Sequence, residues 1–107
     1  MRLLILLGSA PDTVNARRAF NLAQHCAAAG DNVTVAMVQN GVLAGLKRPA
    51  GQDIFVGENN IEGLALDEDL ELRGFTDEYL APGVKSCSYE ELVDRMMEQS
   101  GRVWGVF

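Results

Sequence analysis

The strongest constraint on the fold comes from the first apolar segment of the chain. The segment Arg2–Leu7 carries five aliphatic residues in a row and ends at the turn-forming sequence Gly8-Ser9-Ala10-Pro11. A strand with one face in water alternates apolar and polar residues, whereas a strand buried on both faces is apolar throughout. Burial on both faces is typical of a parallel sheet that helices cover on each side. This segment therefore predicts an α/β protein.

Helix-like and strand-like segments then alternate along the chain. Between Thr13 and Gly30, apolar residues recur every three or four positions, which is the pattern of an amphipathic helix. Asp12 or Thr13 can cap that helix and Gly30 can end it. Further strands are expected at Asn32–Val38, Ile61–Leu66, Gly83–Ser86 and Arg102–Phe107. Further helices are expected at Val42–Leu46, at Glu68–Arg73 with Asp67 as its cap, and after the capping box formed by Ser88 and Glu91.

This alternation of strands and helices defines the expected architecture. Strand–helix–strand units with short connections form right-handed crossovers and a mostly parallel sheet. We therefore predict a single domain over residues 1–107, built as three layers (α/β/α) around a five-stranded, mainly parallel sheet. Met96 and Met97 lie on an apolar stripe of the last helix and are expected to pack in the core. Within the irregular segment 48–60, Ile54–Val56 is either a short strand or a buried patch under a loop.

Composition excludes several classes of function. Nine Lys and Arg residues stand against fifteen Asp and Glu residues, a formal net charge of −6, so we expect no direct nucleic-acid binding. Two cysteines are too few for a disulfide scaffold, and with the single histidine they do not complete a zinc site. We expect no metal and no cofactor. The longest aliphatic run is far shorter than the roughly 20 residues of a membrane span, so a cytoplasmic protein with reduced thiols is expected.

Three groups of polar residues invite a catalytic or binding interpretation that the sequence does not favour. The loop Gly8–Pro11 precedes a helix but lacks a phosphate-binding fingerprint, and Asp12 places a negative charge there. Ser9 and His25 are not accompanied by a nucleophile-elbow motif. An acidic cluster is better explained by helix capping and solvation than by acid–base or metal chemistry; its members are Asp67, Glu68, Asp69 and Glu71.

The two cysteines are the remaining nucleophile candidates. Cys26 lies on the apolar stripe toward the end of the first helix, so it is either a small buried hydrophobe or a reactive thiol. A helix C-terminus does not stabilise a thiolate. Cys87 precedes the capping residue Ser88, in an expected loop at a helix N-terminus, which favours a thiolate and an accessible side chain. We nevertheless favour an incidental cysteine at that position, with a reactive thiol as the alternative.

Three stretches together resemble the DsrE/DsrF/DsrH-like sulfur-relay superfamily, and most closely its DsrH/TusB-like branch. They are Val38-Gln39-Asn40-Gly41-Val42, the segment Ala65–Phe75 with acidic residues before Arg73-Gly74, and the C-terminal part from Pro82-Gly83-Val84 through Tyr89–Val93 to Trp104. The resemblance implies an α/β domain that forms homo-oligomers or hetero-oligomers with DsrE- and DsrF-like subunits. It also implies a persulfide relay between a protein sulfur donor and a protein acceptor, in sulfur oxidation or tRNA thiolation.

The same resemblance identifies which residues matter for the relay. In DsrE-like members the relay cysteine follows the third strand, where this chain has Leu66, so the chain is not a carrier of that type. Some DsrH-like members carry a cysteine on the first helix, which makes Cys26 the expected acceptor, with Arg17 or Arg18 as a source of positive charge. The alternative is a non-catalytic interaction subunit that supports a cysteine-bearing partner. A nucleotide- or flavin-binding module is the third and weakest hypothesis.

Overall fold

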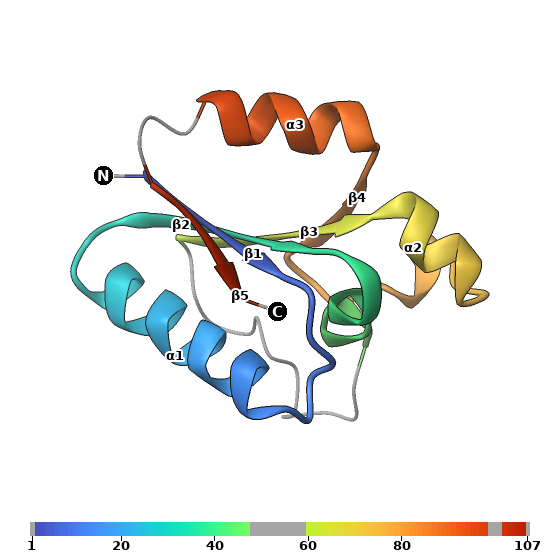
Figure 1. Ribbon diagram of the computed structural model, residues 1–107, viewed down its shortest axis with the longest axis horizontal. Helices are drawn as coiled ribbons and strands as arrows, with labels where there is room; N and C mark the ends of the chain where they lie inside the picture. Colours follow the sequence, from blue (N-terminus) through green and yellow to red (C-terminus); the bar gives the residue numbers. More distant parts are fainter. Residues whose placement is uncertain (1, 48–59, 99–101, 107) are drawn as a thin grey trace.

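Five parallel strands form one sheet in the order β4-β3-β2-β1-β5 (Figure 1). The computed structural model describes residues 2–47, 60–98 and 102–106. The strands are β1 (Arg2–Leu7), β2 (Asn32–Met37), β3 (Ile61–Leu66), β4 (Val84–Cys87) and β5 (Val103–Val106). The helices are α1 (Val14–Ala28), α2 (Asp67–Leu72) and α3 (Tyr89–Glu98), with 3-10 turns η1 (Gln39–Gly45) and η2 (Asp77–Tyr79).

The sheet has a helix on each face, as the sequence predicts. Figure 1 shows α1 on one side of the sheet and α3 on the other. Alternate residues of β1 point to opposite sides of the sheet. Leu3, Ile5 and Leu7 pack on the α1 side, whereas Leu4 packs with Leu92 of α3. Because both faces of β1 are covered, an unbroken apolar sequence is the stable choice there. The three-layer α/β/α architecture with a five-stranded sheet is confirmed.

Local sequence signals set the helix boundaries. The hydroxyl of Thr13 accepts a hydrogen bond from the Ala16 amide at 3.2 Å and caps α1. Gly30 follows α1 with φ +98° and Gly74 follows α2 with φ +81°, a backbone region that favours glycine. The Ser88 and Glu91 capping box is present in both directions, at 3.1 and 3.3 Å.

Four local expectations need correction, three at the boundaries of helices and strands and the fourth in the packing of α3. The helical turn after β2 begins at Gln39 rather than Val42 and is of the 3-10 type. Asp67 is the first residue of α2 and not its cap, which is Leu66 without any side-chain hydrogen bond. The fourth strand lies one residue later than expected and takes in Cys87. The segment Ile54–Val56 lies outside the described residues.

The fourth correction concerns the apolar stripe of α3. Leu92 is buried and Met96 is half-buried, but Met97 is 81% exposed. Tyr89 and Val93 are also exposed. Half of the stripe therefore packs on the sheet, and the other half faces away from it. In the described part of the chain, no helix is long and apolar enough to cross a membrane.

Candidate functional site

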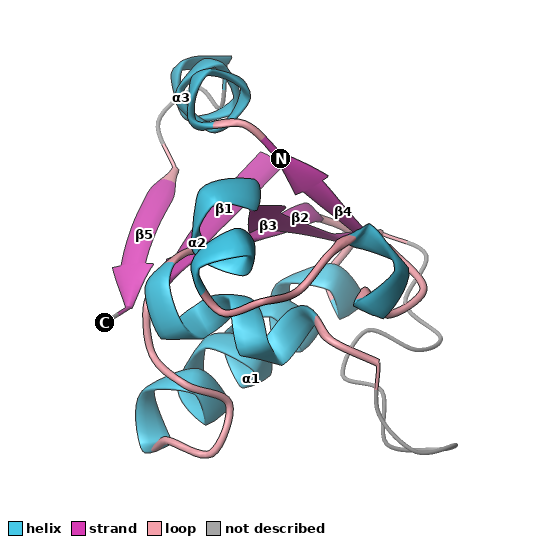
Figure 2. Cartoon of the chain, turned by 90° about the vertical axis from the view of Figure 1, so that its right-hand side faces the viewer, coloured by secondary structure: helices cyan, strands magenta, loops and turns pink. Residues whose placement is uncertain are grey.

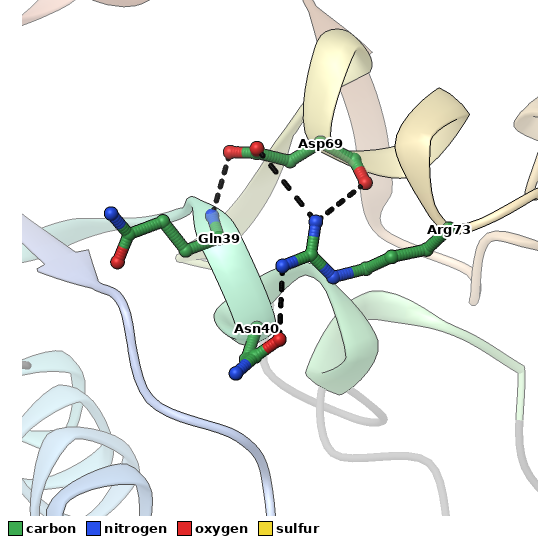
Figure 3. Close-up of polar contacts among 4 residues, drawn as sticks. All are labelled: Gln39, Asn40, Asp69 and Arg73. Carbon is green, nitrogen blue, oxygen red and sulfur yellow. Dashed lines mark hydrogen bonds and ion pairs between the residues drawn. The ribbon is translucent and has the colours of Figure 1, made fainter.

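A set of hydrogen-bonded side chains joins the carboxyl ends of β2 and β3. The Asp69 carboxylate accepts a hydrogen bond from the backbone N–H of Gln39 at 2.6 Å and lies 3.8 Å from the Arg73 guanidinium (Figure 3). Arg73 donates to the backbone oxygen of Asp69 at 3.0 Å and to the Asn40 side chain at 2.9 Å. These contacts hold α2 against η1. Asp69, for which the sequence favoured helix capping and solvation, is therefore part of an ordered polar connection between α2 and η1.

The backbone at Gln39 and Gly41 explains why this connection needs its particular sequence. Gln39 has φ +52°, a left-handed conformation that is uncommon for a residue with a side chain. The hydrogen bond that its backbone N–H donates to the Asp69 carboxylate helps to hold this conformation. A Cβ atom at Gly41 would lie directly against the carbonyl group of Leu7. Glycine is required there because η1 crosses the end of β1 at backbone contact distance.

An apolar groove of about 480 Å³ opens beside this connection, on the α3 side of the sheet. Its floor is formed by the strand ends at Leu6, Val38 and Leu66, and one wall is α3. Gln39 and Asp69 are the polar groups at its border. In open parallel sheets, ligands and partners bind outside the carboxyl ends of the strands, which is where this groove lies. Figure 2 views the molecule from the α2 side, with α3 above the sheet.

Cys87 is the last residue of β4 and is only 4% exposed. Burial, and then the carboxylates of Glu91 and Asp67, raise the pKa of its thiol to about 11, whereas Arg95 opposes this effect. A thiol with such a pKa is protonated at neutral pH and is a poor nucleophile. The expected loop position of Cys87, which would have favoured an accessible and ionisable thiol, is therefore wrong, whereas the burial agrees with the favoured interpretation of an incidental cysteine. Its place on a buried strand and its carboxylate neighbours are the physical reason.

Cys26 lies in the last turn of α1, half-buried against the core that α1 forms with the sheet. Arg17 is nine residues earlier on the same helix, so about 13 Å of helix rise separates it from Cys26. Arg18 is one residue closer. Both arginines are exposed, and neither lies near enough along this helix to pair with a Cys26 thiolate. The positive charge expected from Arg17 or Arg18 is therefore not next to this thiol.

The other sequence candidates do not converge. Ser9 lies in the loop before α1, whereas His25 is an exposed residue near the opposite end of that helix. The cluster Asp67–Glu71 lies in and after the first turn of α2, with Asp69 engaged as described. Among the residues described, no group of three or more His, Cys, Asp or Glu side chains could hold a metal ion.

One ordered polar cluster had no signal in the sequence. Arg95 of α3 donates to both carboxylate oxygens of Glu62 at 3.1 and 3.0 Å, and to the hydroxyl of Thr34 at 3.2 Å. The hydrogen bonds with Glu62 raise the pKa of Arg95, and the bond to Thr34 satisfies the hydroxyl of a residue that is 5% exposed on the sheet. The cluster fixes α3 on the amino-terminal half of the strands, next to a cavity of about 490 Å³. Arg95 and Thr34 are 61 positions apart in the sequence, so no local sequence pattern predicts their contact.

The fold and the site define a small parallel α/β domain whose carboxyl edge carries an ordered polar connection and an apolar groove. The model of one protein family, described as DsrH-like, matches residues 15–101. The chain belongs to this DsrH-like family, within the DsrH/TusB-like branch of the sulfur-relay proteins. A search of curated proteins found no match.

Three solved structures share the fold. The YchN protein from E. coli is 18% identical, with a TM-score of 0.78 and coverage of 98% of this chain and 99% of that one. MTH1491 from Methanobacterium thermoautotrophicum, a protein of unknown function, is 16% identical with a TM-score of 0.78 and 97% coverage of both chains. Tm0979 from Thermotoga maritima is 20% identical, with a TM-score of 0.61 and coverage of 94% and 97%. At these identities the likeness establishes the fold alone.

Proposed function

We propose that this chain is a non-catalytic subunit of a sulfur-relay assembly, which binds a cysteine-bearing DsrE-like subunit and completes the site on that partner. The residue at the end of β3 carries the proposal. DsrE-like relay subunits resemble this chain there but have a cysteine, whereas this chain has Leu66. Leu66 is buried and lines the apolar groove, and none of the described groove-lining residues is a cysteine.

The environment of Cys87 supports this proposal. A relay thiol has to ionise and to reach a sulfur atom on another protein. Cys87 is buried beside carboxylates that oppose ionisation. Members of this family generally work in complexes with DsrE- and DsrF-like subunits, which gives a subunit without its own relay cysteine a place to act. The proposal includes a cytoplasmic location, where the partner's thiol stays reduced.

The proposal is tested by reconstituting the chain with a DsrE-like protein of the same organism that has been loaded with a persulfide. Light scattering after size exclusion measures assembly, and intact-protein mass spectrometry follows the sulfur atom. We expect the double variant Cys26→Ser/Cys87→Ser to assemble and to support sulfur transfer by the partner at the wild-type rate. Loss of transfer in the double variant, with assembly intact, would show that this chain carries sulfur itself.

A direct sulfur role for Cys26 is the second candidate function, and the partial exposure of this thiol favours it over Cys87. The Cys26 thiolate would attack the outer sulfur of a donor persulfide. A new S–S bond would form, the donor's S–S bond would break, and the donor would leave as a thiolate. In the same reconstitution, this function requires a mass gain of one sulfur atom on the wild-type chain and on Cys87→Ser, but not on Cys26→Ser.

A further inference from the structure

Helix α3 is apolar over a wider arc than the sheet covers. At about 100° per residue, its five apolar residues span roughly 140° of the helix circumference. Leu92 and Met96 occupy one side of this arc and pack on the sheet. Tyr89, Val93 and Met97 occupy the other side, and they are 60%, 37% and 81% exposed. Half of an apolar stripe that would ordinarily lie in a core is therefore in contact with water.

The exposed row is continuous with the groove at the carboxyl edge of the sheet. Tyr89, Val93 and Met97 form one wall of that groove, and the strand ends at Leu6, Val38 and Leu66 form its floor. Met97, at the end of the row, lines the groove and is also the most exposed of the three side chains. The surface fits the side chains of a protein, which can fill the groove and cover the helix together.

Exposed carboxylates border this apolar surface on the α3 side. On α3, Glu90 and Asp94 are exposed and follow the apolar row at the adjacent helix positions. Across the groove, the Asp69 carboxylate is already engaged by the Gln39 backbone N–H and by Arg73, so it adds no unpaired charge to this border. The cation of α3, Arg95, is engaged by Glu62 through two hydrogen bonds and does not neutralise this border. A second copy docked face to face would bring Glu90 and Asp94 close to the same carboxylates, which is unfavourable.

We infer that this surface, made of Tyr89, Val93 and Met97 with the adjoining groove, is the docking site for a partner subunit that presents apolar side chains flanked by Lys or Arg. The apolar part supplies contact area, and the carboxylate border selects the basic partner and orients it. This inference rests on the proposed function, because it names the surface through which the chain binds its relay partner.

The test measures the affinity of the full chain for the persulfide-competent DsrE-like protein of the same organism. Met97→Glu places a charge on the most exposed residue of this apolar surface. Leu72→Glu is the matched control, because Leu72 on α2 is also 81% exposed but does not line the groove. We expect Met97→Glu to weaken binding at least about 30-fold, and Leu72→Glu to leave it within about 3-fold. Thermal unfolding checks that both variants fold.

Charge substitutions separate the partner from a second copy. Glu90→Lys and Asp94→Lys should each weaken partner binding by about 3- to 10-fold, and added salt should weaken the wild-type complex. The neutral substitutions Glu90→Gln and Asp94→Asn would strengthen self-association through this face, because they remove the like-charge repulsion between two copies. Self-association by sedimentation that Met97→Glu abolishes and Glu90→Gln strengthens would identify the occupant as a second copy and overturn the inference.

The remaining outcomes distinguish the two proposals. If the complex forms and Met97→Glu and Leu72→Glu bind equally well, the docking surface is wrong but the proposed function stands. If the wild-type chain does not bind the DsrE-like protein at all, the proposed function fails and the docking inference fails with it. Binding that is lost in Met97→Glu, retained in Leu72→Glu and weakened by both charge reversals supports both.

Discussion

The chemistry of Cys87 gives a quantitative prediction about which sulfur atom in this chain can react. With a pKa of about 11, roughly one Cys87 thiol in a thousand is ionised at pH 8. An unperturbed cysteine with a pKa near 8.5 is about one-quarter ionised at the same pH. Because the thiolate is the nucleophile, Cys87 should be alkylated about 200-fold more slowly than in the unfolded chain, before any steric protection by its burial.

The assay is iodoacetamide labelling of Cys26→Ser, followed by intact-protein mass spectrometry between pH 7 and pH 10. We expect the rate at Cys87 to rise about tenfold for each pH unit without a plateau. The same variant in denaturant is the reference. A plateau between pH 8 and pH 9, or a folded rate within tenfold of the denatured rate, would refute the environment derived for this thiol.

The same shift has a consequence for stability at alkaline pH. The folded chain holds the Cys87 proton more tightly than the unfolded chain, so this stabilisation is complete below pH 8.5 and is lost as the pH rises toward 11. By pH 10, the free energy of unfolding should fall by about 2 kcal/mol from this group. Urea titrations at pH 8 and pH 10 measure the loss, and Cys87→Ala should abolish this contribution. An equal alkaline loss in Cys87→Ala would contradict the assignment.

Three further substitutions test the contacts that hold the site. Gly41→Ala should cost at least about 3 kcal/mol in urea unfolding, because the new methyl group meets the Leu7 carbonyl group; unchanged stability would mean that η1 does not cross β1 so closely. A double-mutant cycle of Arg95→Gln and Glu62→Gln should give a coupling of about 0.5–1 kcal/mol that decreases with salt, as expected for a partly exposed ion pair; zero coupling at low salt would contradict the contact. Thr13→Ala should lower the melting temperature through a loss of about 1 kcal/mol of helix capping, and an unchanged melting temperature would contradict the cap.

Some of the site could be predicted from sequence because its signals are local. The acidic residues before Arg73 and the turn at Asn40-Gly41 were visible as a family pattern, although not as partners. Their pairing was hidden because Gln39 and Asp69 are 30 positions apart and meet only when β2 and β3 lie side by side. Cys87 was expected in a loop, but β4 extends one residue further than predicted and includes it. That one residue is enough to place the side chain in the core.

The sequence by itself determined the order of strands and helices, the capping box at Ser88, a cap at Asp12 or Thr13, and the parallel sheet, because these follow from apolar periodicity and short-range hydrogen bonding. Only the tertiary structure decided which apolar residues of α3 meet the sheet and which face water. A helical stripe shows that a surface is apolar, but the width of the contact depends on where the helix is anchored. Arg95 anchors α3 through Glu62 and Thr34, and Tyr89, Val93 and Met97 are left as the exposed surface.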